Sequence, residues 1–251
     1  MKALITGASS GLGRDMAKYL SHLGWDLIIV ARREERLKEL QKTLKTDVKI
    51  INLDLGVEEN CYKLYEMTKK DNIDLLINNA GFGLFGLTTE TSLDRELEMI
   101  NLNIKAVHIL TKLFLQDFYQ KDQGQILNVA SSAGFLAGPR LNTYYATKNY
   151  VVSLSLAIYE ELKKDNSNVK ISIFCPGPVD TNFNNVANVK FNLKSLSSEY
   201  ASKYAIDNMF KDKVIILPPN MKLNHTLTKI CPTDLILFVN SKIQGRKIGK
   251  K

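Results

Sequence analysis

Short apolar runs alternate with helix-like segments along this chain. Each run is nearly continuously apolar, which is typical of a parallel strand buried on both faces of a sheet. Between the runs, apolar residues recur every three or four positions, which is typical of helices with one buried face. The runs that predict strands are Ala3–Thr6, Leu27–Val30, Val48–Ile51, Leu75–Ile77, Ile126–Val129, Val169–Phe174 and, later, Val214–Leu217.

The segments between these runs carry helix signals. Arg14–Leu23 has apolar residues at helical spacing and is followed by Gly24, a favourable C-cap. Glu34–Leu44 repeats the pattern, and Met221–Gln244 is expected to form one or two helices, interrupted near Pro232. Strands alternating with helices predict an α/β fold: a single Rossmann-like, doubly wound parallel sheet with helices on both faces. Because no linker or repeat divides residues 1–251, we expect one domain.

The composition is that of an ordinary globular protein, with 45% hydrophobic and 24% charged residues. The three cysteines are far apart and form no CxxC motif, so we expect neither disulfides nor a metal site. The chain opens without the charged leader and apolar stretch of a signal peptide. No apolar run approaches the ~18 residues that span a bilayer. We therefore expect a cytoplasmic protein without stable membrane insertion.

The positive charge is concentrated at the C-terminus. The net charge is +8, and residues 242–251 contain five basic residues and no acid. Such a basic tail can contact an anionic membrane or nucleic acid, but a solvated chain end is the commoner outcome and the one we expect. Because the tail has no interleaved aromatic residues and no recognisable motif, we do not expect nucleic acid as a partner.

A glycine-rich turn follows the first predicted strand. The sequence Thr6-Gly7-Ala8-Ser9-Ser10-Gly11-Leu12-Gly13 leads directly into a predicted helix. Glycines in a strand-to-helix turn allow a tight bend, close approach of the backbone to a pyrophosphate, and close packing of helix on strand. The helix N-terminus then offers free N–H groups to phosphates. Glycines also serve ordinary turns, but this position in an alternating chain favours a dinucleotide site.

The end of the second predicted strand indicates which dinucleotide is bound. NAD-binding proteins place an acid there for the ribose 2′-hydroxyl, whereas NADP-binding proteins place an arginine nearby for the 2′-phosphate. Here the strand ends as Ala31-Arg32-Arg33, and Glu34 suits the first turn of the next helix. The arginines could be solvated loop charges, but with the glycine loop upstream we expect them to bind the 2′-phosphate of NADP.

A tyrosine and a lysine share one face of a later helix. Tyr144 and Lys148 are four residues apart, so their side chains are neighbours. A tyrosine has a pKa of about 10 and is a weak acid–base group at neutral pH. A neighbouring ammonium would favour the phenolate and lower that pKa. The spacing alone is common by chance, so its meaning depends on the rest of the sequence.

Several motifs occur together in a fixed order, and in this combination the sequence resembles the short-chain dehydrogenase/reductase family. The resemblance covers roughly residues 2–185, and the C-terminal part is similar to a bacterial-type reductase subgroup with a basic helical end. The motifs are Thr6–Gly13, Asn78-Asn79-Ala80-Gly81, Asn103, Ser131, Tyr144 with Lys148, and Pro176-Gly177.

The resemblance implies an NADP-dependent oxidoreductase that moves a hydride between the nicotinamide and a carbonyl or secondary alcohol carbon. Tyr144 would be the general acid for reduction and the base for oxidation. Lys148 would lower the pKa of Tyr144 and hold the nicotinamide ribose, and Ser131 would hydrogen-bond the substrate oxygen. Asn103 would bind a water in a proton relay to Lys148.

The resemblance also implies the cofactor contacts. Asp54 would contact adenine, Asn79 and Ala80 the adenosine side, and Val179 and Thr181 the carboxamide. The expected cofactor-binding residues are Gly7, Ser9, Ser10, Gly11, Leu12, Gly13, Arg32, Arg33, Asp54, Leu55, Asn79, Ala80, Gly81, Tyr144, Lys148, Pro176, Gly177, Val179 and Thr181.

Neighbouring residues offer alternatives at three positions. Tyr145 stands beside Tyr144 but is three residues before Lys148, so its side chain points about 100° away around the helix. We expect Tyr145 to pack or to form pocket wall. The spacing to Tyr144 selects Ser131 over Ser132, and the family pattern selects Asn103 over Asn101.

The substrate is not encoded in these motifs. Residues 182–200 follow the Pro-Gly motif, where the family carries a mobile substrate lid, and their scattered apolar points suit an apolar ligand or an ordinary surface loop. Phe82, Leu84, Phe85, Phe135 and Leu136 are equally compatible with pocket wall and core. Apolar residues on more than one face of helices 104–119 and 145–163 favour a homodimer or homotetramer. The alternative function is a non-catalytic NADP-binding sensor or scaffold.

Overall fold

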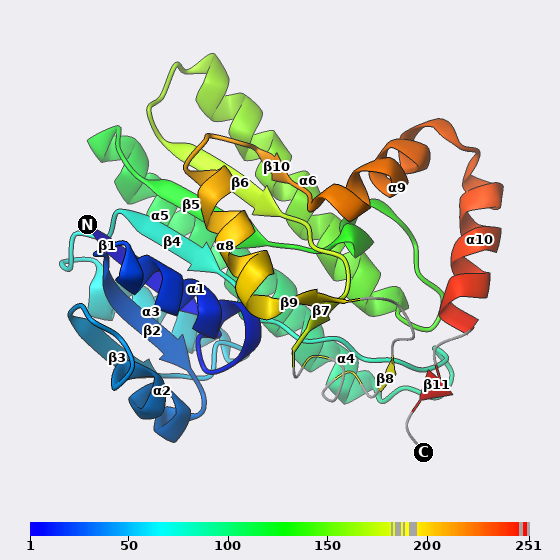
Figure 1. The fold of residues 1–251 in the computed structure, drawn as a ribbon, viewed down its shortest axis with the longest axis horizontal. Coiled ribbons are helices and arrows are strands. Elements are labelled where there is room, and N and C mark those ends of the chain that lie inside the picture. Colours follow the sequence, from blue (N-terminus) through cyan, green and yellow to red (C-terminus); the bar gives the residue numbers. More distant parts are fainter. Residues whose placement is uncertain (182, 184–186, 188, 191–194, 246–247, 250–251) are drawn as a thin grey trace.

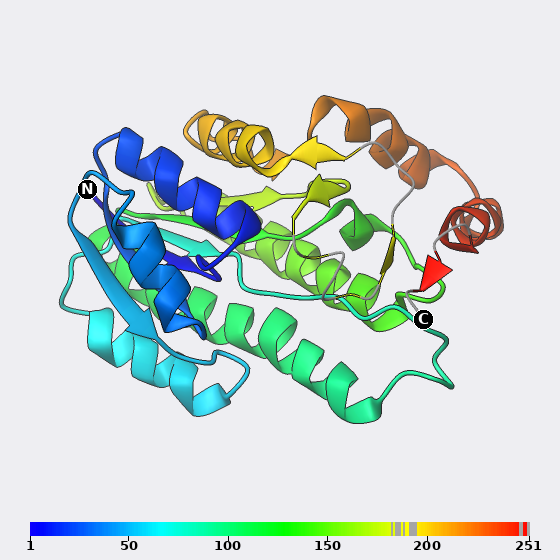
Figure 2. The same ribbon diagram turned by 60° about the horizontal axis from the view of Figure 1, so that its bottom comes forward.

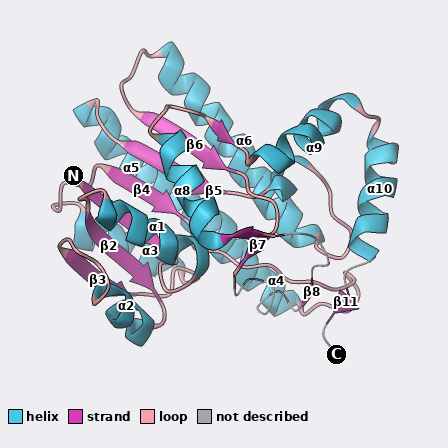
Figure 3. Cartoon of the chain, in the orientation of Figure 1, coloured by secondary structure: helices cyan, strands magenta, loops and turns pink. Residues whose placement is uncertain are grey.

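A parallel sheet forms the centre of the computed structural model, which describes residues 1–251 except 182, 184–186, 188, 191–194, 246–247 and 250–251 (Figure 1). The sheet has seven strands in the order β10-β6-β5-β4-β1-β2-β3, and every pairing is parallel (Figure 3). The strands are β1 Lys2–Thr6, β2 Asp26–Ala31, β3 Val48–Asn52, β4 Leu75–Asn78, β5 Gln125–Val129, β6 Lys170–Phe174 and β10 Ile215–Ile216.

Helices cover both faces of this sheet, because successive side chains of a strand point to opposite sides. Ala3 and Ile5 join the buried cluster under one set of helices, whereas Leu4 between them joins the cluster under the other. Figure 2 shows the two helical layers. The first layer contains α1 Gly11–His22, α2 Glu34–Gln41 and α8 Ser198–Met209, and the second contains α3 Glu58–Thr68, α5 Val107–Lys121 and α6 Asn142–Lys164. The predicted doubly wound α/β fold is confirmed.

The sequence located the sheet strands to within one residue at each end, but helix bounds were less accurate. The first helix begins at Gly11 rather than Arg14, because the end of the glycine loop already has helical conformation. Gly24 follows it with a φ of +84°, as its predicted role at the helix end requires. The second helix ends at Gln41, and Leu44 packs against the core from outside the helix.

A π-helical turn interrupts the long helix before the second half of the sheet. α4 spans Leu93–Ile100, the π-helical turn spans Asn101–Ala106, and α5 continues at Val107. π-helical turns inside α-helices are frequent at functional sites, since they shift side chains and backbone carbonyls out of the regular pattern. Asn103, a predicted catalytic residue, lies in this turn.

Two helices and two small sheets complete the C-terminal part. α9 Pro219–Ile230 and α10 Thr233–Gly245 are separated at Pro232, as predicted. β7 Val179–Asp180 pairs with β9 Leu196–Ser197, and β8 Val189–Lys190 pairs with β11 Ile248–Gly249.

Two predicted C-terminal segments have different bounds in the structure. The predicted lid 182–200 falls partly outside the described residues, and its last three residues belong to α8. The predicted basic tail 242–251 begins inside α10, and residues 248–249 pair with β8. The part of the tail that the structure describes is therefore ordered secondary structure rather than a frayed end.

The described residues contain neither a candidate membrane span nor a candidate metal cluster. No described helix combines the length and apolar character needed to cross a bilayer. Within the same residues, no group of three or more His, Cys, Asp or Glu side chains is arranged to hold a metal ion.

Candidate active site

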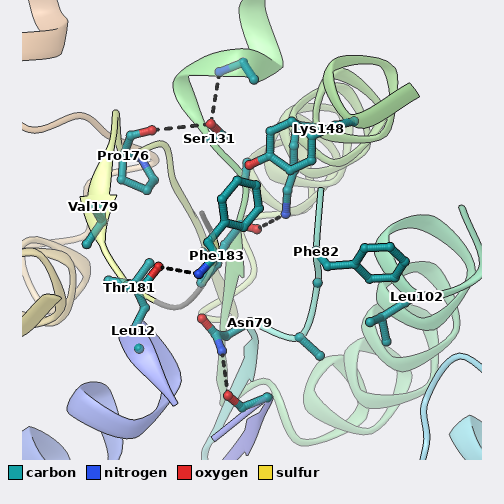
Figure 4. A pocket seen from close by; sticks show the side chains of 18 of the residues that line it. Leu12, Asn79, Phe82, Leu102, Ser131, Lys148, Pro176, Val179, Thr181 and Phe183 are labelled. Atoms are coloured by element: carbon teal, nitrogen blue, oxygen red, sulfur yellow. Dashed lines mark hydrogen bonds between the residues drawn. The ribbon is translucent and has the colours of Figure 1, made fainter. Parts of the chain in front are cut away.

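The site lies at the carboxyl ends of β1 and β4, where the strand order reverses. From β1 the sheet continues through β2 and β3 on one side, and from β4 it continues through β5, β6 and β10 on the other. Ligands of open α/β sheets bind in the crevice at such a switch point. A cavity of about 430 Å³ occupies this crevice. Its lining runs from the glycine loop to the start of α6 (Figure 4).

The glycines of the phosphate loop occupy positions where no other residue fits. Gly7 has a φ of +69° and Gly11 a φ of +55°, which is the left-handed region that favours glycine. A Cβ on Gly7 would lie 2.8 Å from the Ala80 Cα, and a Cβ on Gly13 would lie 2.6 Å from the Gly7 carbonyl oxygen. The loop and the N-terminus of α1 thus form a cradle of backbone N–H groups that suits a pyrophosphate.

Asn79 and Thr6 fasten the two loops of the crevice together. The Asn79 Nδ2 donates to the Thr6 carbonyl oxygen at 2.9 Å. The backbone N–H groups of Asn79 and Ala80 both donate to the Thr6 hydroxyl at 3.0 Å. The Asn79 side chain therefore stabilises the glycine loop by hydrogen bonds, and it also lines the pocket. Thr6 was not predicted as a site residue, because a threonine that ends a strand carries no distinctive signal.

Two arginines lie differently beside the glycine loop. The Arg33 Nη2 donates to the hydroxyls of Ser9 at 3.0 Å and Ser10 at 3.1 Å. The Arg32 Nη1 instead lies 3.5 Å from the Asp54 carboxylate. Partial burial, followed by the positive charges of Arg36 and Arg32, lowers the pKa of the Arg33 guanidinium. The edge of the loop is thus electropositive, and Arg33 rather than Arg32 is held against it.

Three predicted catalytic side chains meet at the other end of the cavity. Tyr144 and Lys148 lie one turn apart near the start of α6, and Ser131 follows β5. The Ser131 hydroxyl accepts a hydrogen bond from the Ala133 N–H at 3.1 Å and lies 3.4 Å from the Pro176 carbonyl oxygen (Figure 4). The Lys148 Nζ donates to the Val129 carbonyl oxygen at 2.9 Å.

The surroundings shift the pKa values of both titratable groups. Burial raises the pKa of Tyr144 to about 12, and a hydrogen bond with Ser131 acts in the opposite direction. Burial lowers the pKa of Lys148 to about 8. The predicted lowering of the Tyr144 pKa by Lys148 is not seen in this structure, since the Lys148 Nζ bonds to Val129 and lies 5.9 Å from the Tyr144 ring centre. Burial is the largest influence on the Tyr144 pKa, and the phenol stays protonated at neutral pH.

Asn103 is buried behind the pocket rather than lining it. Its Oδ1 accepts a hydrogen bond from the Phe82 N–H at 3.1 Å, and its Nδ2 donates to the Phe82 carbonyl oxygen at 2.9 Å. The same Nδ2 reaches the Thr147 hydroxyl at 3.1 Å. The side chain therefore ties the loop after β4 to the residue preceding Lys148. Its predicted relay role stays a prediction, and its contacts show a positioning role.

The cavity brings the other predicted site residues together, and Gly13 is the second one, after Asn103, that does not line it. Apart from Gly13 and Asn103, every predicted catalytic and cofactor-binding residue lines the cavity. Gly13 faces the Gly7 carbonyl oxygen and the Asn79 amide, so it serves the packing of α1 on the loop. This agrees with the third-glycine role that the loop pattern predicted.

The substrate end of the cavity is mainly apolar. Tyr145 forms pocket wall, as expected, and Phe183 of the predicted lid lies with its ring centre 5.3 Å from that of Tyr144. Of the five residues that the sequence left open, Phe82 and Leu136 line the cavity, and Leu84, Phe85 and Phe135 are not among its lining residues. Phe85 is buried beside Leu141 and Ala187, and Phe135 packs on the core cluster that includes Val151.

Three further lining residues come from the C-terminal helices and were not predicted. They are Met221, Asn240 and Ile243. No motif marks them, and only the path of α9 and α10 brings them to the site.

Comparison with known proteins places the chain in a family. The family model described as "short chain dehydrogenase" matches residues 1–191. An uncharacterised oxidoreductase of Staphylococcus epidermidis is 32% identical over 181 residues, which are 71% of this chain and 78% of the relative. An uncharacterised oxidoreductase of Staphylococcus saprophyticus is also 32% identical, over 185 residues, with the same shares of both chains.

Solved structures agree with this match. A short-chain dehydrogenase from Sphingobium yanoikuyae in complex with NADPH has a TM-score of 0.82 and 25% identity, over 92% of this chain and 96% of the other. A short-chain dehydrogenase/reductase from Burkholderia phymatum in complex with NAD has a TM-score of 0.82 and 24% identity, over 90% and 92%. With the glycine cradle and the Ser131, Tyr144 and Lys148 cluster in one crevice, the chain belongs to the short-chain dehydrogenase family and is an oxidoreductase.

Proposed function

We propose that this protein is an NADP-dependent oxidoreductase that reduces a carbonyl to a secondary alcohol or catalyses the reverse reaction. The observation that carries the proposal is the single cavity that joins the glycine cradle to the Ser131 and Tyr144 hydroxyls and the Lys148 ammonium. The cradle suits a dinucleotide, because Gly7 and Gly11 adopt left-handed conformations and the N-terminus of α1 offers free N–H groups to phosphates. When bound, the nicotinamide supplies or accepts the hydride.

The residues of this chain would handle the proton and the oxygen. The Ser131 and Tyr144 hydroxyls would both donate hydrogen bonds to the substrate carbonyl oxygen, and Tyr144 would transfer its proton during reduction. The phenolate that this leaves would be stabilised by the Lys148 ammonium. Because burial raises the pKa of Tyr144 to about 12, the proton that reduction needs is present on the phenol at neutral pH.

The preference for NADP rests on the loop between β2 and α2. Arg33 already bonds to two serine hydroxyls of the glycine loop, and a 2′-phosphate at this edge would meet its guanidinium. Arg32 would add charge from its place beside Asp54. Ala31 leaves the strand end without the acid that would repel a phosphate. One structural relative was solved with NADPH and another with NAD, so this loop is the basis for the choice.

The substrate is proposed to be a fairly apolar carbonyl or alcohol. Leu141 and Phe183 pack in one cluster with Tyr144, and Phe82, Leu136 and Met221 also line the cavity. Such walls recognise a ligand mainly by shape and apolar area. We further propose a cytoplasmic protein with one domain that assembles as a homodimer or homotetramer.

The test is NADPH oxidation against a panel of ketones and aldehydes that differ in apolar bulk. We expect turnover with at least one bulky apolar carbonyl. Tight NADPH binding without turnover on any member would favour the alternative that the protein is an NADP-binding sensor or scaffold. The Tyr144→Phe variant is the control, since any turnover that it retains does not depend on the proposed proton donor.

A further inference from the structure

The C-terminal helices α9 and α10 present an apolar surface to solvent. Ile230 at the end of α9 is 74% exposed, and Phe238 in the middle of α10 is 58% exposed. In α10 the exposed positions recur at the spacing of a single helical stripe. Among the described side chains of the two helices, the exposed large apolar ones are Leu227, Ile230, Leu235, Phe238, Val239 and Ile243, and we call them the C-terminal apolar face.

The orientation of α10 is fixed by its opposite side. Asn240 is buried, and its Nδ2 donates to the Ala137 carbonyl oxygen at 2.6 Å. With Asn240 directed toward the body, Leu235, Phe238 and Val239 are left on the outside. Figures 1 and 2 both show α10 at the edge of the molecule, with the rest of the chain on one side of it. The C-terminal apolar face is therefore open to an external partner.

The sequence of this segment is basic. Residues 218–251 contain seven basic residues and one acid, Asp234, in a chain whose net charge is +8. Among the side chains that the structure describes there, Lys222 and Lys242 are exposed. Lys242 belongs to the exposed stripe, and its Nζ lies 4.3 Å from the centre of the Phe238 ring. A lysine that lies along apolar side chains can keep them covered while its ammonium stays at a polar boundary.

Charge decides between the two simplest occupants of the face. A second copy would bring another strongly basic segment against the first, and the like charges would oppose association. An anionic bilayer surface instead satisfies both features, since its headgroups attract the basic residues and its acyl boundary accepts the apolar ones. We propose that α9 and α10 dock peripherally on anionic lipid bilayers through the C-terminal apolar face.

Docking of this kind would bring the substrate pocket to the bilayer. Asn240 and Ile243 line the cavity from α10, and Ile243 also belongs to the C-terminal apolar face. A carbonyl compound dissolved among the lipids would thus have a short path to the site. This consequence rests on the proposed function, whereas the docking does not.

The experiment is co-sedimentation of the full chain with lipid vesicles. One set contains equal parts phosphatidylglycerol and phosphatidylcholine, and the other contains phosphatidylcholine alone. We expect binding to the anionic set and a decrease as salt is raised, because screening weakens the attraction to the headgroups. Replacing Leu235 and Phe238 together by Ser should weaken the binding by about tenfold or more, since two apolar side chains are lost from the interface.

A matched control lies at the other end of the molecule. Tyr62 of α3 is an aromatic residue with 48% exposure, and Tyr62→Ser should leave vesicle binding unchanged. Equal far-UV circular dichroism spectra and equal Tm values for all variants show that each is folded.

Three outcomes would overturn the proposal. One is no binding to anionic vesicles, and another is equal binding by wild type and the double variant. The third is a smaller assembly of the double variant in light scattering with vesicle binding unchanged, which would assign the face to contacts between copies. Sedimentation does not depend on catalysis. A failure of NADPH turnover would therefore contradict the proposed function but not the proposed docking.

Discussion

At the residue scale, Tyr144 gives the sharpest test of the chemistry. Tyr144→Phe removes the transferable proton and leaves the ring contact with Phe183 in place. We expect turnover to fall by at least ~10²-fold, which is the usual contribution of positioned acid–base catalysis, with NADPH affinity retained. Single-turnover kinetics and NADPH titration measure the two quantities. Near-normal turnover would make the neighbouring Tyr145 the candidate, although its ring packs against Gly138.

The lowered pKa of Lys148 predicts a pH dependence. Burial places this pKa at about 8, below the ordinary 10.5, so the ammonium is present below pH 8 and is lost above it. If the ammonium stabilises the Tyr144 phenolate, kcat/KM for reduction should be level below pH 8 and fall about tenfold per pH unit above it. Lys148→Arg keeps the charge and should remove this decline. A wild-type profile that is flat to pH 10 would contradict the assigned role.

The cofactor preference is also decided by single side chains. We expect kcat/KM to favour NADPH over NADH by at least ~10-fold, since a charged hydrogen bond is worth roughly 1.5–3 kcal/mol and 1.4 kcal/mol is tenfold. Arg33→Ser should remove most of this preference, because Arg33 is the arginine held at the glycine loop. Ala31→Asp with Arg32→Ser should reverse it by adding repulsion.

The controls for this prediction are NADH and a neighbouring arginine. kcat/KM with NADH should not change in Arg33→Ser, and Arg36→Ser should keep the preference, because no hydrogen bond joins its described side chain to the loop. Equal use of both cofactors by the wild type would show that these arginines are solvated loop charges.

At the element scale, the packing of α1 on the glycine loop can be tested at Gly13. Helix propensity alone predicts that Gly13→Ala stabilises the protein by about 1 kcal/mol. The structure predicts the opposite, since the new Cβ would lie 2.6 Å from the Gly7 carbonyl oxygen and overpacking costs roughly 1–3 kcal/mol. We expect a lower Tm and weaker NADPH binding.

An exposed position in the same helix isolates the propensity effect. Lys18→Gly should lower stability by about 1 kcal/mol and leave NADPH affinity unchanged. A higher Tm for Gly13→Ala with unchanged NADPH affinity would show that the loop yields to the methyl group.

The positions of the motifs at strand and helix ends explain why the sequence predicted most of the site. The glycine turn, Asn78–Gly81 and the Tyr144–Lys148 pair are each local, and each directly follows a strand or starts a helix. Since the carboxyl ends of parallel strands meet at one edge, finding the strands was enough to bring these loops together. The pattern could not show that Asn103 turns behind the pocket, because that depends on the π-helical turn and on its bonds to Phe82.

At the scale of the whole molecule, the assembly predicted through helices 104–119 and 145–163 stays a prediction. Val107, Leu110, Phe114 and Phe118 of α5 are buried inside the subunit, whereas Ile109, Leu113 and Leu115 are half-buried. Among the described residues of those two segments, the exposed large apolar side chains are Tyr119 and Tyr150. α4 instead exposes Leu93 and Leu97.

We still expect a homodimer or homotetramer at micromolar concentration. Because Leu93 and Leu97 of α4 are exposed, they are a further candidate for the contact. Leu93→Glu with Leu97→Glu should therefore produce a smaller species, because charges would be placed in an apolar interface. Light scattering measures the molar mass of the wild-type assembly and of the double variant. A wild-type monomer would refute the assembly, and an unchanged double variant would move the contact elsewhere.

The sequence by itself determined the sheet, the layers and the cofactor end of the crevice. These depend on local spacing: apolar runs define buried strands, and glycine positions define turns that other residues cannot adopt. Only the tertiary structure decided the substrate end, where Met221, Asn240 and Ile243 reach the cavity from helices far along the chain.

It also decided that burial, rather than the neighbouring lysine, sets the pKa of Tyr144. Periodicity records which side of an element is buried but not which distant element buries it. The hydrogen bond between Asn240 and Ala137, 103 residues apart in sequence, is an example of a contact between distant elements that periodicity does not predict.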